Sequence, residues 1–161
     1  MPQPRTRSLE RFRLDGLIAL ITGAGRGLGE ACAVALADAG AEVILMSRTE
    51  RELNDLKARI EADGGIARTA ICDVAAPTAI AAVVPALGQI DILVNNAGIN
   101  IPEPFLDVSL DHLDTILNLN LRGAFLMAQA VARSMVMRGQ GGSIINMSSQ
   151  MGHVGAPNRT A

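Results

Sequence analysis

The stretch 22–29, TGAGRGLG, has residue types and spacing that suit phosphate binding. It lies between the apolar run 17–21 and the Ala-rich segment 28–39, so the pattern predicts a strand, a tight turn and a helix. Glycines let the backbone turn sharply and approach a pyrophosphate, and the helix then offers free N–H groups and the positive end of its dipole. No Gly-Lys-Ser/Thr sequence is present, which excludes the phosphate loop of NTP hydrolases, and the spacing differs from the GxGxxG of the larger dehydrogenases.

Polar residues stand at the ends of other apolar runs. Asp73 and Val74 end one run, NNAG at 95–98 directly follows the next, and GGSIINMSS at 141–149 ends in two serines. A further polar residue, Asn120, lies within an expected helix. Taken singly, these residues have simple structural explanations. The asparagines of NNAG suit an Asx turn, and Asn120 suits a polar interruption in a helix. Their order along the chain is the more specific signal.

Together these features resemble the motifs of the short-chain dehydrogenase/reductase family: TGxxxGxG, an Asp that contacts adenine, NNAG, the Asn of the catalytic tetrad, and the strand that delivers the catalytic Ser. The motifs stand in the family's order over nearly the whole chain, and they resemble bacterial 3-oxoacyl-ACP reductases and gluconate 5-dehydrogenase-like members. The resemblance implies that Ser149 and Asn120 are catalytic, with the Asn holding a water in a proton relay. It also implies cofactor contacts from Thr22, Gly23, Gly25, Arg26, Gly27, Leu28, Gly29, Ser47, Arg48, Asp73, Val74, Asn95, Ala97 and Gly98.

The choice of Ser149 over Ser148 rests on the family's spacing. In the family a Tyr acts as the acid/base, a Lys lowers the pKa of that Tyr and binds the nicotinamide ribose, and the Ser hydrogen-bonds the carbonyl. The family's Ser lies thirteen residues before its Tyr, and the Lys follows four after. Counting from Ser149 places the Tyr directly after Ala161, whereas Ser148 would put Ala161 in its place. A chain that ends at Ala161 is expected to be inactive, and a longer parent protein whose C-terminal third carries Tyr and Lys is the favoured interpretation.

The end of the second expected strand bears on the choice of nicotinamide cofactor. That position meets the adenosine ribose in a doubly wound dinucleotide site, and an acidic residue there favours NAD. Here Ser47 stands in it, followed by Arg48, and a guanidinium can form charge-assisted bonds to the 2′-phosphate of NADP. Arg26 can reach the same phosphate, and basic residues at these two positions mark NADP-preferring members of the family. NADP(H) is therefore expected over NAD(H); the alternative is that Arg48 is an ordinary exposed residue at the start of a helix.

Apolar runs alternate with helical patterns along the whole chain, which is typical of a parallel sheet covered on both faces. The expected strands are 17–21, 42–46, 67–74 (the weakest), 91–94 and 143–147; the expected helices are 28–39, 50–63, 76–87, and one from a Ser109 cap to about Arg138. This alternation predicts an α/β fold, a Rossmann-like doubly wound parallel sheet, in one incomplete domain over 1–161 with a flexible leader at 1–15.

The last expected helix is apolar nearly all round. Its main stripe is Leu113, Ile116, Leu117, Leu121, Phe125, Ala128, Val131 and Met135, with further apolar side chains off that stripe. Such a helix indicates a second covering surface, so a homodimer or homotetramer is expected.

Composition excludes several classes of protein. Apolar residues make up 49% of the chain, and the net charge of −2 offers no footprint for nucleic acid or an anionic membrane. No apolar run approaches the roughly 20 residues that span a bilayer, and the N-terminus is too polar for a secretory signal, so a cytoplasmic protein is expected. Cys32 and Cys72 show no metal-site spacing and suit small buried side chains, so neither a disulfide nor a metal is expected.

These observations predict an NADP(H)-dependent oxidoreductase that transfers a hydride between the nicotinamide and a small ketone or secondary alcohol. Two alternatives remain: a non-catalytic NADP-binding sensor or scaffold, and a fragment that needs a partner chain to complete its sheet. The expected substrate pocket retains the loop 99–105 and the segment 151–154, both mostly apolar, with Glu103 and His153 as their ionisable residues.

Overall fold

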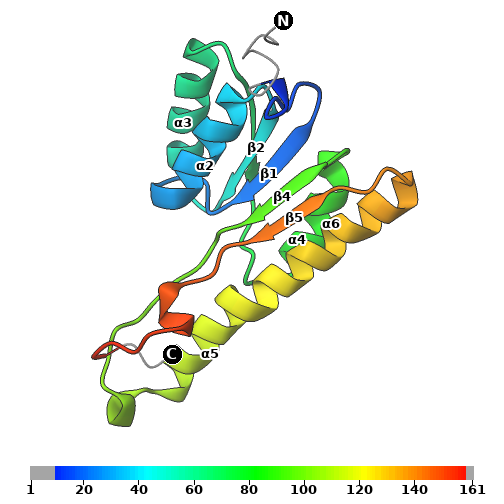
Figure 1. Cartoon of the computed structure of the whole chain (residues 1–161). Helices are drawn as coiled ribbons and strands as arrows, with labels where there is room; N and C mark the ends of the chain where they lie inside the picture. The colour runs from blue at the N-terminus through cyan, green and yellow to red at the C-terminus, as the bar shows by residue number, and fades with distance from the viewer. Residues whose placement is uncertain (1–9, 159–161) are drawn as a thin grey trace, which may run out of the picture.

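A computed structural model describes residues 10–158 and shows a five-stranded parallel sheet with helices on both faces (Figure 1). The strands are β1 (Ile18–Thr22), β2 (Glu42–Ser47), β3 (Ile66–Ile71), β4 (Ile92–Asn95) and β5 (Ser143–Asn146), in the spatial order β3-β2-β1-β4-β5. This is the doubly wound Rossmann-like arrangement, so the predicted fold class is confirmed.

Alternate side chains of the central strands feed two separate cores. Ile21 and Leu45 pack under α2 (Gly27–Asp38) and α3 (Glu50–Ala62), whereas Leu20 and Ile44 pack toward the opposite face. That opposite face is covered by α4 (Pro77–Val83) and α6 (Ala124–Arg138), as Figure 1 shows. Because both faces are covered, the middle strands are apolar at nearly every position, as the sequence predicted. The edge strand β5 differs, since all four of its residues are exposed.

The strand order reverses direction at β1. The chain builds outward through β2 and β3 on one side, then crosses back so that β4 pairs with the other edge of β1, with Ile21 opposite Val94. The segments that follow the strands therefore gather at the carboxyl end of the sheet, where a crevice is expected beside the reversal of strand order. This is where the fold positions the candidate site.

Two predicted helices differ in detail from the structure. The segment expected as one helix over 76–87 is α4 followed by a 3₁₀ turn at Val84–Leu87. Pro85 accounts for the change, because proline has no N–H to donate to an α-helical bond.

The long helix also departs from the prediction of one regular element. Ser109 caps it as expected, its Oγ accepting from His112 N at 3.1 Å. The helix then divides into α5 (Leu110–Leu117), the π-helical segment η3 (Asn118–Gly123) and α6. A π turn contains an extra residue, which rotates the following helix face relative to a regular helix. The expected stripe is therefore only partly buried: Met127, which is not in it, lies in the core beside Val131 and Met135, whereas Leu121 and Phe125 are exposed.

The expected N-terminal leader falls partly within the described residues. Residues 1–9 of the expected leader lie outside the described residues. Leu14, within the expected leader, packs against the core under α2, and its N–H donates to Ala39 O at 2.8 Å. In the part of the chain from 10 to 158, no helix combines the length and the apolar character needed to cross a membrane.

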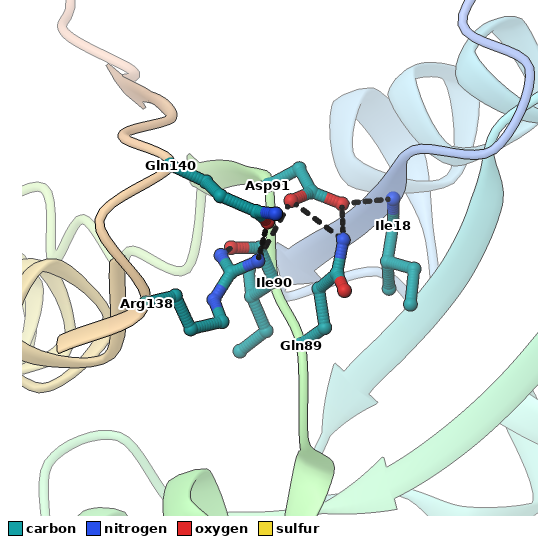
Figure 2. A network of polar contacts seen from close by, with 6 residues as sticks. All are labelled: Ile18, Gln89, Ile90, Asp91, Arg138 and Gln140. Atoms are coloured by element: carbon teal, nitrogen blue, oxygen red, sulfur yellow. Dashed lines mark hydrogen bonds and ion pairs between the residues drawn. The ribbon is translucent and has the colours of Figure 1, made fainter. Parts of the chain in front are cut away.

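A polar network at the amino ends of the strands holds the last helix to the sheet (Figure 2). The Asp91 carboxylate accepts from Ile18 N at 2.9 Å, from Gln89 Nε2 at 2.9 and 3.0 Å, and from Arg138 Nη1 at 3.1 Å. Arg138 also donates to Ile90 O, and Asp91 O accepts from Ser143 N at 2.9 Å. One carboxylate thus connects the starts of β1 and β4 to the end of α6, just before β5.

Replacing Asp91 by Ala should lower the free energy of unfolding by about 2–4 kcal/mol, because it leaves the mostly buried Arg138 guanidinium and the Ile18 N–H without their partner. Urea unfolding followed by circular dichroism measures this. The matched control is Glu61→Ala, which removes an exposed carboxylate paired with Lys57 at 3.7 Å and should change stability by less than about 0.5 kcal/mol. Equal effects of the two substitutions would contradict the assigned role of Asp91.

The same carboxylate should make stability depend on pH. Burial by itself would raise the pKa of Asp91, but the bonds from Ile18, Gln89 and Arg138 outweigh it and the pKa is lowered. A carboxyl with a lowered folded pKa contributes its full stabilisation above the unfolded pKa of roughly 4 and loses it as the pH falls through the folded pKa. The stability difference between wild type and Asp91→Ala should therefore shrink below about pH 4.

Candidate active site and cofactor cleft

A cavity of about 490 Å³ lies at the carboxyl end of the sheet, beside the reversal of strand order. It is bounded by the glycine-rich turn after β1, the ends of β2 and β3, and the NNAG segment after β4. Its lining residues are Gly23, Gly25, Arg26, Gly27, Leu28, Met46, Ser47, Arg48, Thr49, Glu52, Cys72, Asp73, Val74, Asn96, Ala97, Gly98 and Leu119. Segments that are far apart in sequence therefore form one site.

The glycine-rich turn packs closely against the NNAG segment. Gly23 has a φ of +64°, and a Cβ on it would lie 2.9 Å from the Ala97 Cα. The Asn96 amide donates to Thr22 O at 3.0 Å and to Gly23 O at 3.2 Å. Asn96 thus fixes the shape of the turn from the neighbouring strand.

Thr22 and Asn95 lie behind the cavity wall and join its elements. The Thr22 Oγ1 accepts from the N–H groups of Asn96 and Ala97, both at 3.0 Å, and donates to Val94 O at 3.4 Å. The Asn95 amide donates to Ala124 O at 3.0 Å. It also donates to Asn146 Oδ1 at 2.9 Å, which links β4 to the edge strand. Both side chains are buried, so they act on the shape of the site rather than on a ligand directly.

The N-terminus of α2 has the features of an anion-binding site. Its N-cap, Arg26, has extended backbone, and its side chain makes no capping hydrogen bond to the helix. The first-turn N–H groups therefore lack a side-chain acceptor, and they lie next to the glycine turn that lines the cavity. Free N–H groups at the positive end of a helix dipole fit a phosphate group.

The far end of the cavity carries charged side chains. Arg48 Nη1 lies 4.0 Å from Asp73 Oδ2; the Arg48 side chain is largely exposed and that of Asp73 is partly exposed. Ser47 Oγ accepts from Thr49 N at 3.1 Å, so it ends β2 in a tight local turn. Asp73 Oδ1 accepts from Ala75 N at 3.0 Å. The serine and the arginine predicted to meet the adenosine ribose and a 2′-phosphate therefore line the same end of the site.

The Asn120 side chain forms two hydrogen bonds to the backbone of one residue. Its Oδ1 accepts from Ile99 N and its Nδ2 donates to Ile99 O, both at 2.8 Å. A Cβ on Gly98 would lie 3.2 Å from the same Oδ1. Asn120 sits in η3, so its amide fastens the π-helical segment to the loop after NNAG.

Ser149 lies after β5 and is exposed. Its Oγ accepts from Met151 N at 3.1 Å, which caps the short 3₁₀ turn Gln150–Gly152. A hydroxyl that accepts through its oxygen keeps its proton, so Ser149 can still donate to a substrate oxygen.

The loop after NNAG is held at a second point. His112 Nδ1 lies 3.0 and 3.1 Å from the two carboxylate oxygens of Glu103. Glu103, expected in the wall of the substrate pocket, therefore has its partner on α5. His153, the other ionisable residue expected there, is exposed beyond the turn that Ser149 caps.

The structure separates the predicted site residues into three groups. Most predicted cofactor contacts line the cavity directly, whereas Thr22, Gly29 and Asn95 support its wall, and Asn120 and Ser149 lie outside its lining. Sequence reasoning did not assign six residues that line the cavity: Met46, Thr49, Glu52, Cys72, Asn96 and Leu119. The NNAG motif itself contained the signal for Asn96. Glu52 gave none, because an acidic residue in the first turn of a helix is ordinary.

Both cysteines are free thiols, and Cys72 lines the cavity. Burial raises the pKa of the Cys72 thiol, and the charge of Asp73 raises it further, which favours the neutral form. Among residues 10–158, no group of three or more His, Cys, Asp or Glu side chains is arranged to hold a metal ion.

Comparison with known proteins gives the context for this geometry. Mouse (Mus musculus) L-xylulose reductase is 39% identical over 147 residues, covering 91% of this chain and 59% of that enzyme. A gluconate 5-dehydrogenase from Burkholderia cenocepacia, solved with NADP and tartrate, superposes with a TM-score of 0.89 at 42% identity, covering 94% of this chain and 61% of that one. A 7α-hydroxysteroid dehydrogenase solved with NADH and a 7-oxo bile acid superposes with a TM-score of 0.87 at 35% identity, covering 92% and 59%.

The chain thus spans about three fifths of the length of these relatives. A model of the short chain dehydrogenase family matches residues 17–161, which is all of the sheet and the cavity described above. The resemblance inferred from the motifs is confirmed, and the chain belongs to the short-chain dehydrogenase/reductase family.

Proposed function

We propose that this chain is the NADP(H)-binding part of an oxidoreductase that acts on a small ketone or secondary alcohol. One observation carries the proposal: a single cavity joins a glycine turn and an uncapped helix N-terminus to two arginines, Arg26 and Arg48. The glycine turn and the helix N-terminus suit a pyrophosphate, and the two arginines suit a 2′-phosphate. The relatives with NADP in their solved structures support the same cofactor.

Different residues would bind different parts of the cofactor. The turn from Gly23 to Gly29 and the start of α2 would hold the pyrophosphate, and Ser47 and Arg48 would hold the adenosine ribose and its phosphate. Asp73 and Val74 would contact the adenine, and Ala97 and Gly98 the second ribose. When bound, the nicotinamide supplies or accepts the hydride at its C4.

Two residues are assigned to the reaction itself. Ser149 would donate its hydroxyl proton to the substrate oxygen and so orient the carbonyl. Asn120 would keep the loop after NNAG in place through its bonds to Ile99. The family resemblance also implies that it would hold a water for proton transfer. The Tyr and Lys that the family resemblance implies would complete the proton path in a longer chain.

The arginine assignment predicts a selective loss of affinity. Replacing Arg48 by Ala should weaken NADPH binding by about 10- to 100-fold, the scale of one lost charge-assisted bond, and should change NADH binding by less than about threefold. Parallel calorimetric titrations of both nucleotides measure this. Arg51→Ala is the control, because Arg51 is an exposed arginine at the start of α3, three residues after Arg48, and does not line the cavity. Equal weakening of both nucleotides by Arg48→Ala would contradict the assignment to the 2′-phosphate.

The exposed apolar side chains of the long helix bear on assembly. Leu121 and Phe125, one turn apart, are 67% and 63% exposed, and Leu117 is 45% exposed. A contiguous apolar strip of this kind supports a homo-oligomer built on this helix.

A further inference from the structure

The cavity proposed for NADP(H) holds balanced charge. Its lining includes two guanidiniums, Arg26 and Arg48, and two carboxylates, Glu52 and Asp73. Asp73 is accounted for by its proximity to Arg48 and its bond from Ala75 N. Glu52 differs: within residues 10–158 its carboxylate forms no ion pair and no side-chain hydrogen bond.

The position of Glu52 is close to the phosphate-binding turn. A Cβ built on Gly25 would lie 2.6 Å from Glu52 Oε2 and 3.0 Å from Glu52 Cβ, so the carboxylate packs over that glycine. Gly25 directly precedes Arg26, the residue proposed to contact the 2′-phosphate. Glu52 is half-buried, which strengthens its electrostatic interactions relative to a fully exposed carboxylate.

The helix dipole does not account for this placement by itself. Glu50 and Glu52 both stand in the first turn of α3, where negative charge is favoured by the dipole. Glu50 is exposed and does not line the cavity, whereas Glu52 lines it. One acidic residue would therefore suffice for the helix, and the second lies in the cavity proposed to hold the nucleotide.

We propose that Glu52 is a specificity-determining residue that limits the preference of this site for a 2′-phosphorylated nucleotide. Its carboxylate opposes the additional negative charge of a 2′-phosphate but not the 2′-hydroxyl of a nucleotide without it. The site then accepts both nucleotide classes, with the arginines favouring the phosphorylated one and Glu52 reducing that advantage. This inference rests on the proposed nucleotide site.

The test compares 2′,5′-ADP with 5′-AMP, which differ only in the 2′-phosphate, by calorimetry on the wild-type chain and on Glu52→Gln. The variant should bind 2′,5′-ADP about 3- to 10-fold more tightly and 5′-AMP within about twofold of wild type, as expected for one unit charge acting across a partly solvated site. The gain should shrink in 0.5 M salt, because ions screen the carboxylate. Glu50→Gln is the matched control and should change neither affinity.

The possible outcomes separate this inference from the proposed function. If the wild type prefers 2′,5′-ADP but Glu52→Gln matches Glu50→Gln, the role of Glu52 is overturned and the arginine assignment remains. If the wild type shows no preference while Glu52→Gln creates one, the role of Glu52 is supported and the NADP preference of the wild type is not. If neither nucleotide binds, both proposals fail.

Discussion

Replacing Ser149 by Ala, in a protein that carries this chain together with the remaining length of its relatives, should lower kcat about 100- to 1000-fold. That is the scale of losing one hydrogen-bond donor to a reacting carbonyl oxygen. Ser149 follows β5 and caps a short turn through its oxygen, so its proton is free to be donated. NADPH affinity should hardly change, because Ser149 does not line the cavity that the phosphates are proposed to occupy. Single-turnover kinetics with a ketone substrate, paired with NADPH titration, separate the two effects.

Ser148 provides the matched control for this prediction. Ser148→Ala removes the neighbouring hydroxyl from the same exposed segment and should lower kcat by less than about tenfold. A large loss with Ser148→Ala and a small one with Ser149→Ala would show that the catalytic register is shifted by one residue. Absence of turnover on a broad panel of ketones and alcohols, with NADPH binding intact, would instead favour a non-catalytic nucleotide-binding module.

The sheet could be predicted from the sequence because most of its strands are short, continuous apolar runs separated by helical patterns. Leu53, Leu56 and Ile60 show the helical counterpart: they recur at helical spacing within the expected helix 50–63, and all three are buried residues of α3. The π turn was not predictable in this way. It depends on Asn120 meeting the backbone of Ile99 and on the close approach of Gly123 to the Val74 carbonyl, and both contacts join segments distant in sequence.

The candidate site shows the same division. Motifs identified most of the residues that face the cavity, because the glycine turn and the ends of the strands have characteristic sequences. The supporting contacts were missed: Asn96 holds the turn by bonds to Thr22 and Gly23, and Glu52 reaches Gly25 from a different helix. Such contacts depend on how loops pack in three dimensions, which neither periodicity nor local spacing determines.

Gly29 gives the sharpest test of that packing. In an ordinary helical position Gly→Ala stabilises a protein by roughly 0.5–1 kcal/mol. Gly29 lies in the first turn of α2, where a Cβ would come within 2.2 Å of Gly23 O and 2.5 Å of Asn96 Nδ2. Gly29→Ala should therefore destabilise the fold by about 1–3 kcal/mol, the usual range for an overpacked site.

The same substitution should weaken NADPH binding by about 100-fold, because the methyl group displaces the turn that presents backbone N–H groups to the pyrophosphate, and one or two charge-assisted bonds are lost. Gly64→Ala is the control: Gly64 has a φ of +87° with nothing near its Cβ position, so alanine there should cost about 1–2 kcal/mol of stability through backbone strain alone. It lies at the end of α3, away from the cavity lining, and should leave NADPH affinity unchanged. Thermal unfolding measures the stability of both variants, and NADPH titration measures their affinity for the cofactor. A Gly29→Ala protein that is more stable than wild type, or that binds NADPH as tightly, would show that the turn does not depend on this close approach.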